Sequence, residues 1–123
     1  MECTRVARFE NGEDERAMSV GVDATGGIVV VEDLRGPSTL VAYGDDHRRL
    51  RVAFDSQAAR RIVAELGFSA EGEGLWSFLS DGSRDIVDLM DACDRMCIPY
   101  TFTAIGSHSG MQLRTASGLD VRA

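Results

Sequence analysis

The sequence predicts an α+β domain, with a mostly antiparallel sheet of about five to seven strands and two or three helices packed on one face. Three observations lead to this prediction. Short alternating segments with glycine-rich turns dominate residues 3–54. Two segments with apolar residues at helical spacing follow, at 56–66 and 86–97. Strand-like patterns then return at 100–105 and 111–115.

The first half is predicted to be a meander of strands. Asn11 and Gly12 are a strong hairpin signal. The β-branched run 28–34 is typical of a central strand buried on both faces. Gly36 and Pro37 break the chain before the fourth strand. The predicted strands cover residues 3–9, 17–23, 28–34, 39–43 and 50–54.

The first predicted helix runs to Leu66 and ends at Gly67. Asp55 or Ser56 caps its start, because either side chain accepts a hydrogen bond from a free backbone N–H. Residues 75–79 are too short to classify by periodicity; a short helix is favoured, with a strand as the alternative.

The second predicted helix covers residues 86–97 and carries one apolar stripe. Ser83 is the predicted cap, and Pro99 ends the helix because it cannot continue the hydrogen-bond ladder. The stripe consists of Ile86, Leu89, Met90, Cys93, Met96 and Cys97. We therefore expect both cysteines to be buried and to act as small hydrophobic residues.

The opposite side of this helix carries Asp85, Asp88, Asp91 and Asp94. Aspartate costs a helix roughly 0.5–0.7 kcal/mol relative to alanine, and acids at this spacing repel one another. Two interpretations remain: a solvated face, or a docking surface for a basic partner. Trp76, the only tryptophan, is either a core residue or a further anchor of that interface.

Composition limits the function classes. The 123 residues suit a single domain, 1–123, with 116–123 as a frayed tail. The net charge of −7 argues against nucleic acid and anionic membranes as partners, and it suits a basic protein. Residues 1–15 lack the apolar run of a signal peptide, and no membrane span is present. Three cysteines fit reduced thiols, so a cytoplasmic location is expected.

Candidate chemistry is sparse, so an enzyme is the less favoured prediction and no cofactor or metal is expected. Cys93 and Cys97 lack the second ligand pair of a zinc site. The turn 45–47 is read as solvated, because it lacks the remaining ligands of a calcium loop. His108 lies between two serines without the flanking pattern of a nucleophile elbow.

Two alternatives to a protein-binding module stay open. One is a small-ligand or enzymatic domain with a pocket between helices and sheet, lined by Trp76, Tyr100 and His108. The other is a homodimer formed through an exposed strand edge.

Four short motifs carry a resemblance: VEDLRGP at 31–37, GDD at 44–46, VAFDSQ at 52–57 and CIPYTF at 97–102. Together they resemble a group of small uncharacterised bacterial proteins with a strand-rich first half and a closing IPYxF strand. The resemblance spans about residues 27–105 and departs at 67–80, where a glycine-rich segment replaces a longer helix. It implies an immunity-, antitoxin- or inhibitor-type partner protein and assigns no functional residue.

Overall fold

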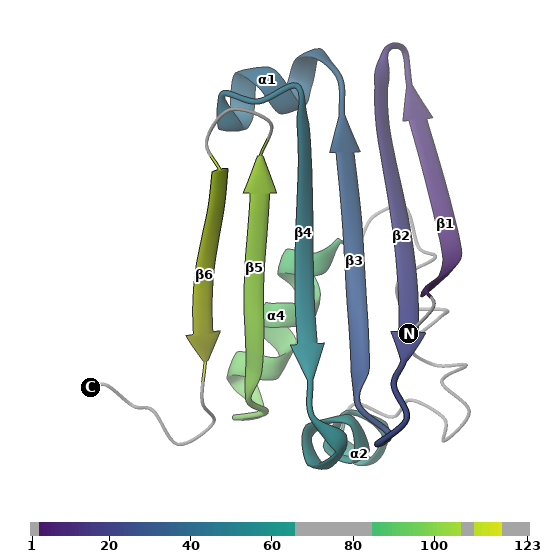
Figure 1. Ribbon diagram of the computed structural model, residues 1–123, viewed down its shortest axis with the longest axis vertical. Helices are drawn as coiled ribbons and strands as arrows, with labels where there is room; N and C mark the ends of the chain where they lie inside the picture. Colours follow the sequence, from purple (N-terminus) through teal and green to yellow (C-terminus); the bar gives the residue numbers. More distant parts are fainter. Residues whose placement is uncertain (1–2, 66–84, 107–109, 117–123) are drawn as a thin grey trace.

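The computed structural model describes residues 3–65, 85–106 and 110–116 (Figure 1). In this part of the chain, six strands form one antiparallel sheet in the order β1-β2-β3-β4-β5-β6, so every strand pairs with its neighbour in sequence. The strands are β1 Cys3–Asn11, β2 Asp14–Val22, β3 Ile28–Arg35, β4 His47–Phe54, β5 Tyr100–Gly106 and β6 Gly110–Ala116. The helices are α1 Pro37–Tyr43, α2 Ser56–Glu65 and α4 Ile86–Arg95. The predicted α+β class is confirmed.

The three described helices lie on the same face of the sheet. Figure 1 shows α4 crossing behind β3, β4 and β5, with α1 and α2 at opposite ends of the sheet. The other face carries no helix from the described part of the chain (Figure 1).

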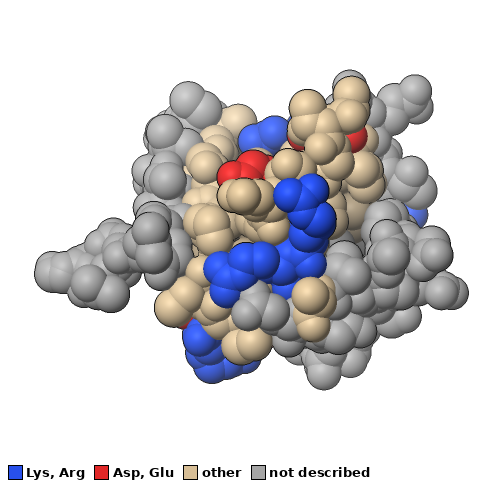
Figure 2. Space-filling model, turned by 90° about the horizontal axis from the view of Figure 1, so that it is seen from below, with Lys and Arg blue, Asp and Glu red and all other residues tan. Residues whose placement is uncertain are grey.

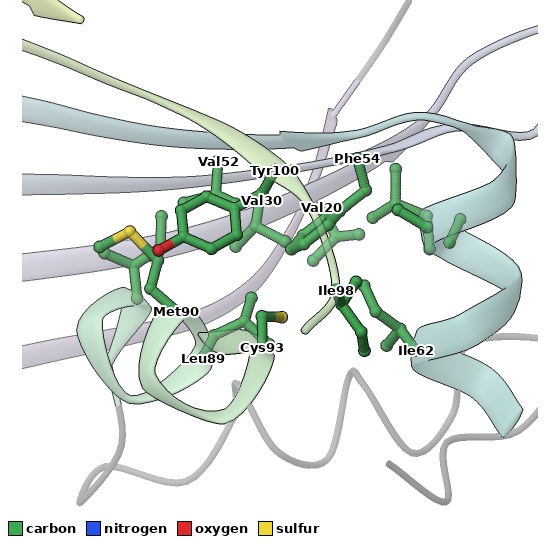
Figure 3. Close-up of a cluster of buried hydrophobic side chains, with 14 of the residues drawn as sticks. Val20, Val30, Val52, Phe54, Ile62, Leu89, Met90, Cys93, Ile98 and Tyr100 are labelled. Atoms are coloured by element: carbon green, nitrogen blue, oxygen red, sulfur yellow. The ribbon is translucent and has the colours of Figure 1, made fainter. Parts of the chain in front are cut away.

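The core fills the space between the sheet and the helices, as Figure 3 shows. Val20, Val30 and Val52 pair across three strands, and all three are at most 1% exposed. The helices contribute Ala58, Ala59, Ile62, Ile86, Leu89, Met90 and Cys93. Each large apolar side chain buried in this way stabilises the fold by roughly 1.5–3 kcal/mol.

The prediction of a strand at 39–43 is wrong, because this segment belongs to helix α1. Pro37 occupies the first helical turn, where its missing N–H is not needed. Asp14 caps the helix from the preceding hairpin: its carboxylate accepts hydrogen bonds from the backbone N–H, at 2.9 Å, and the hydroxyl of Ser38. Gly44 ends the helix in the left-handed conformation, with φ of 79°.

Gly36 is required by the close approach of the hairpin to α1. Its φ is 117°, and a Cβ at this position would lie 2.6 Å from both the Asp14 Oδ1 and the Glu13 carbonyl oxygen. A side chain there would displace the carboxylate that caps the helix. The lack of a side chain at Gly36 therefore allows β2 and α1 to approach closely at one end of the sheet.

The other elements follow the sequence closely. The strands predicted at 3–9, 17–23, 28–34, 50–54 and 111–115 are confirmed, each with ends extended or shifted by a few residues. Asp55 is the cap of α2, accepting a hydrogen bond from the Ala58 N–H at 2.8 Å. The segment 75–79 and the proposed stop at Gly67 lie outside the described residues.

Candidate functional site

Helix α4 begins one residue after Asp85, and Asp85 rather than Ser83 is its cap. The Asp85 Oδ1 accepts a hydrogen bond from the Asp88 N–H at 3.0 Å, and the Asp88 Oδ2 accepts one from the Asp85 N–H at 2.9 Å. This reciprocal pair is a capping box with aspartate in the place of glutamate. Two of the four aspartates predicted to form the docking surface therefore stabilise the start of the helix.

The other two aspartates differ from each other. Asp91 is exposed in the middle of α4, and no ion pair within the described residues involves it or Asp88. The Asp94 Oδ1 accepts a hydrogen bond from the Tyr100 hydroxyl at 2.8 Å. Because Asp94 lies near the negative end of the helix dipole, this bond offsets an unfavourable position.

Among the described residues, the Tyr100 side chain lies in the filled core and not in a pocket. It is 3% exposed, and its ring makes an edge contact with Phe54 at a centroid distance of 6.2 Å (Figure 3). The other two residues of the predicted pocket, Trp76 and His108, lie outside the described residues. Of this predicted pocket, only the position of Tyr100 is therefore described, and it belongs to the core.

The expectation that both helical cysteines are buried is wrong for Cys97. The helix ends at Arg95, and Cys97 is exposed with φ of 56°. The Arg61 guanidinium donates hydrogen bonds to the carbonyl oxygens of Met96, at 2.7 Å, and Cys97, at 2.6 Å. Cys93 is buried as expected, and burial raises the pKa of its thiol to about 12.

The turn at 45–47 also differs from its prediction as a solvated segment. The Asp45 side chain is fully buried, and its Oδ2 lies 3.6 Å from the Arg48 Nη1. Within the described residues, no group of three or more histidine, cysteine or acidic side chains is arranged to hold a metal ion.

The solvent side of α4 carries one apolar side chain beside the acids. Val87 is 44% exposed, next to the exposed Asp88, Asp91 and Asp94. We call Val87, Asp88, Asp91 and Asp94 the α4 face. The sequence pattern identified the acids of this face but not Val87.

A pocket of about 200 Å³ opens between α1 and the start of α4. We call it the α1–α4 pocket. Its lining combines two carboxylates, one guanidinium, two hydroxyls, one phenol and three aliphatic side chains. They are Arg16, Glu32, Leu34, Ser38, Thr39, Tyr43, Leu50, Asp85 and Val87.

Glu32 is the buried acid of this pocket. Its side chain is 2% exposed, and its Oε2 accepts a hydrogen bond from the Arg16 Nη1 at 2.9 Å. Burial raises the pKa of Glu32; Arg16 lowers it and the nearby charge of Asp85 raises it further. The two carboxylates are therefore close enough to repel one another.

Helix α1 also exposes apolar side chains. Leu40 is 49% exposed and Val41 is 87% exposed, an unusual display for a helix of seven residues. Tyr43 is 43% exposed, lines the pocket and receives the Arg48 guanidinium over its ring at 4.6 Å. We call Leu40, Val41 and Tyr43 the α1 rim.

Two sequence signals point to this pocket in retrospect. Glu32 falls on the inner side of the alternation through Val30 and Leu34, where an acid is unexpected. Pro37 followed by Gly44 marks the ends of a short helix. The contact of Asp85 with this site depends on the long-range packing of α4, which no local pattern reveals.

The opposite end of the molecule is basic. Figure 2 shows arginine side chains gathered in a band when the molecule is viewed from the end that carries α2. Helix α2 contributes Arg60, which is exposed, and Arg61, which is half-buried. The acidic α4 face and the arginines of α2 are thus two surfaces of opposite charge, which meet where Arg61 contacts Met96 and Cys97.

Comparison with protein-family models, with curated proteins and with solved structures finds no match to this chain. None of the described helices has the length and apolar character needed to cross a membrane. The function is therefore argued from the surface itself.

Proposed function

We propose that this chain is a non-enzymatic binding module of immunity, antitoxin or inhibitor type, which docks a basic protein in the cytoplasm. The docking surface consists of the α4 face and the α1 rim. The observation that carries the proposal is the exposure of acidic side chains on α4 and of large apolar side chains on both helices, with Tyr43 and Val87 lining one pocket between them. Interfaces combine such an apolar centre with charged groups that steer the partner.

Charge selects the class of partner. The chain has a net charge of −7, and Asp88 and Asp91 form no ion pair within the described residues. A polyanion such as nucleic acid, or an anionic membrane, would be repelled from this face. A basic protein would be attracted, and salt would weaken the encounter by screening. The free thiols Cys93 and Cys97 suit a reducing compartment.

The test uses amphipathic peptides of arginine and leucine as probes, with binding followed by fluorescence anisotropy at low and high salt. The variant Asp88→Asn with Asp91→Asn removes two charges, and asparagine retains the side-chain acceptor of the capping box. We expect weaker binding and a smaller salt dependence.

The matched control is Glu10→Gln with Glu13→Gln. This pair removes the same charge from exposed positions at the end of β1 and in its turn, beside α1 but distant from α4 in the sheet order, so the comparison isolates the acids of the α4 face. We expect binding close to that of the unchanged chain. Equal losses in both double variants would show a general charge effect and overturn the docking surface.

A further inference from the structure

We propose that the α1–α4 pocket receives one cationic side chain, an arginine or a lysine, from the basic partner. The inference rests on the proposed function and identifies where the docked partner is anchored. Tyr43 and Val87 belong both to the pocket lining and to the exposed docking surface, so the pocket opens directly into that surface. Binding energy at interfaces concentrates on side chains that fill such pockets.

The charges of the lining select a cation. Glu32 and Asp85 contribute two carboxylates and Arg16 one guanidinium, which leaves one negative charge in excess. The mutual repulsion of the two carboxylates contributes to the raised pKa of Glu32. A guanidinium or ammonium group placed between them would relieve this repulsion and balance the charge of the lining.

The two oxygens of Glu32 differ in how well they are hydrogen-bonded. Its Oε2 is engaged by Arg16 at 2.9 Å. Among the described residues, its Oε1 accepts a hydrogen bond from the Ile86 N–H alone, at a nitrogen-to-oxygen distance of 3.5 Å, the outer limit of a hydrogen bond. A buried carboxylate oxygen with so long a contact is poorly satisfied, and a charged donor would complete it.

Size and apolar lining fit a single long side chain. The pocket holds about 200 Å³, below the roughly 300–1,000 Å³ of sites for drug-sized ligands. Leu34, Leu50 and Val87 offer apolar contact to the methylene stem of an arginine or lysine, while the charged end meets the carboxylates. Arginine suits the site best, because its guanidinium is planar and weakly hydrated.

The first experiment varies one position of a binding peptide. Peptides that carry arginine, lysine, citrulline or norleucine at this position are titrated against the unchanged protein. Citrulline keeps the shape of arginine without its charge. We expect the arginine and lysine peptides to bind at least about tenfold more tightly than the other two. Equal affinity of the arginine and citrulline peptides would overturn the inference.

The second experiment changes the pocket. Asp85→Asn removes one carboxylate charge, and asparagine caps helices as well as aspartate does, so the fold is kept. Glu32→Gln removes the other charge and keeps an acceptor for Arg16. We expect each variant to reduce the preference for arginine over citrulline by about tenfold. If Glu32→Gln does not fold, the result for Asp85→Asn alone supports or overturns the anchor pocket.

A cross-linking experiment locates the contact. The sequence contains 13 arginines and no lysine, so the protein has no side-chain amine of its own. A carbodiimide will therefore join its carboxylates chiefly to the lysine of a bound peptide. We expect the amide at Asp85 or Glu32, and an amide only at Asp91 or Asp94 would place the cation outside the pocket.

The two proposals fail separately. If the double variant of Asp88 and Asp91 weakens peptide binding while Asp85→Asn, Glu32→Gln and citrulline have no effect, the docking surface stands and the anchor pocket is wrong. If the double variant behaves as its control while citrulline and Asp85→Asn abolish binding, the pocket stands and the extended surface is wrong.

Discussion

At the scale of single residues, Glu32 is the most unusual position in the fold. It occupies the inner face of β3 between Met18 of β2 and Leu50 of β4, where its neighbours are apolar. Moving a carboxylate from water into the core costs several kcal/mol. The attraction within one well-placed ion pair is of about the same size. The pair with Arg16 therefore keeps an acid in the core at little net gain in stability.

This arrangement predicts a specific pH dependence. Because the pKa of Glu32 in the fold is raised above 4.5, the folded state binds more protons than the unfolded state between the two pKa values. The contribution of Glu32 to stability is therefore fully present below the unfolded pKa and is lost as pH rises through the folded pKa. We expect the unchanged protein to lose stability relative to Glu32→Gln over this window, measured by urea unfolding at a series of pH values. A difference that is constant with pH would contradict the prediction.

The two cysteines near the end of α4 should react very differently. Cys97 is exposed, whereas Cys93 is buried with a thiol pKa of about 12. At pH 8 only on the order of one Cys93 thiol in ten thousand is ionised. We expect iodoacetamide to modify Cys97 in the native protein and Cys93 only after unfolding. Peptide mass spectrometry measures both sites, and equal modification in the native state would contradict the prediction.

Some of these residue roles were accessible to sequence reasoning and others were not. The alternation of β3 places Glu32 with Val30 and Leu34, yet the β-branched run favoured a strand buried on both faces. The bond between Tyr100 and Asp94 joins a strand to a helix across a turn, so only the folded geometry reveals it. Cys97 failed the prediction because the helix ends two residues before it.

At the scale of elements, α4 shows why aspartate is tolerated in this helix. Asp85 and Asp88 satisfy backbone N–H groups that would otherwise lack partners, and Asp94 receives a hydroxyl hydrogen bond. Asp91 is the exception, since its exposed carboxylate has no stabilising contact among the described residues. The acidic face is therefore partly structural, and Asp91 is the residue whose charge is most free for a partner.

Alanine substitutions separate these roles. Asp88→Ala breaks the capping box, and we expect it to lower the free energy of unfolding by about 1 kcal/mol. Asp91→Ala, the matched control, replaces a poor helix former by a good one and should be neutral or stabilising by up to about 0.6 kcal/mol. Urea denaturation measures both changes. Similar losses of unfolding free energy in the two variants would show that the capping box does not stabilise the fold.

Helix α1 illustrates the limit of pattern reading at this scale. Residues 39–43 are five consecutive residues with no polar alternation, so periodicity cannot separate a strand from a helix. The flanking Pro37 and Gly44 carry the correct signal, because they match the ends of a helix. The decisive cap, Asp14, comes from another hairpin and cannot be inferred from the local sequence.

At the scale of the whole molecule, an acidic helix face and a basic end can be distinguished, and they meet where α4 ends. The α4 face is acidic, and the end of the molecule around α2 carries a band of arginines (Figure 2). Arg61 belongs to this basic end and donates hydrogen bonds to the last carbonyl groups after α4. These two surfaces of opposite charge favour one orientation of a charged partner as it approaches.

The edge strand β1 bears on whether the sheet pairs with a second copy. It carries the exposed charged residues Arg5, Arg8 and Glu10, and its register with β2 shifts between Arg5 and Ala7. Charge and irregularity at an edge both hinder pairing with another strand. We expect light scattering to give the monomer mass of 13.3 kDa over a range of protein concentrations. A dimer whose β1 amides are protected from hydrogen exchange would contradict this.

The order of strands in the sheet has a consequence for synthesis on the ribosome. Because β1 to β4 each pair with the strand just made, this four-stranded portion can assemble while the rest of the chain is still being translated, at about 5–20 residues per second. Only β5 must return across a long excursion, from Phe54 to Tyr100, to find β4. Until then the edge of β4 and the apolar inner face of the sheet remain exposed. We therefore expect the risk of aggregation to be greatest during this interval.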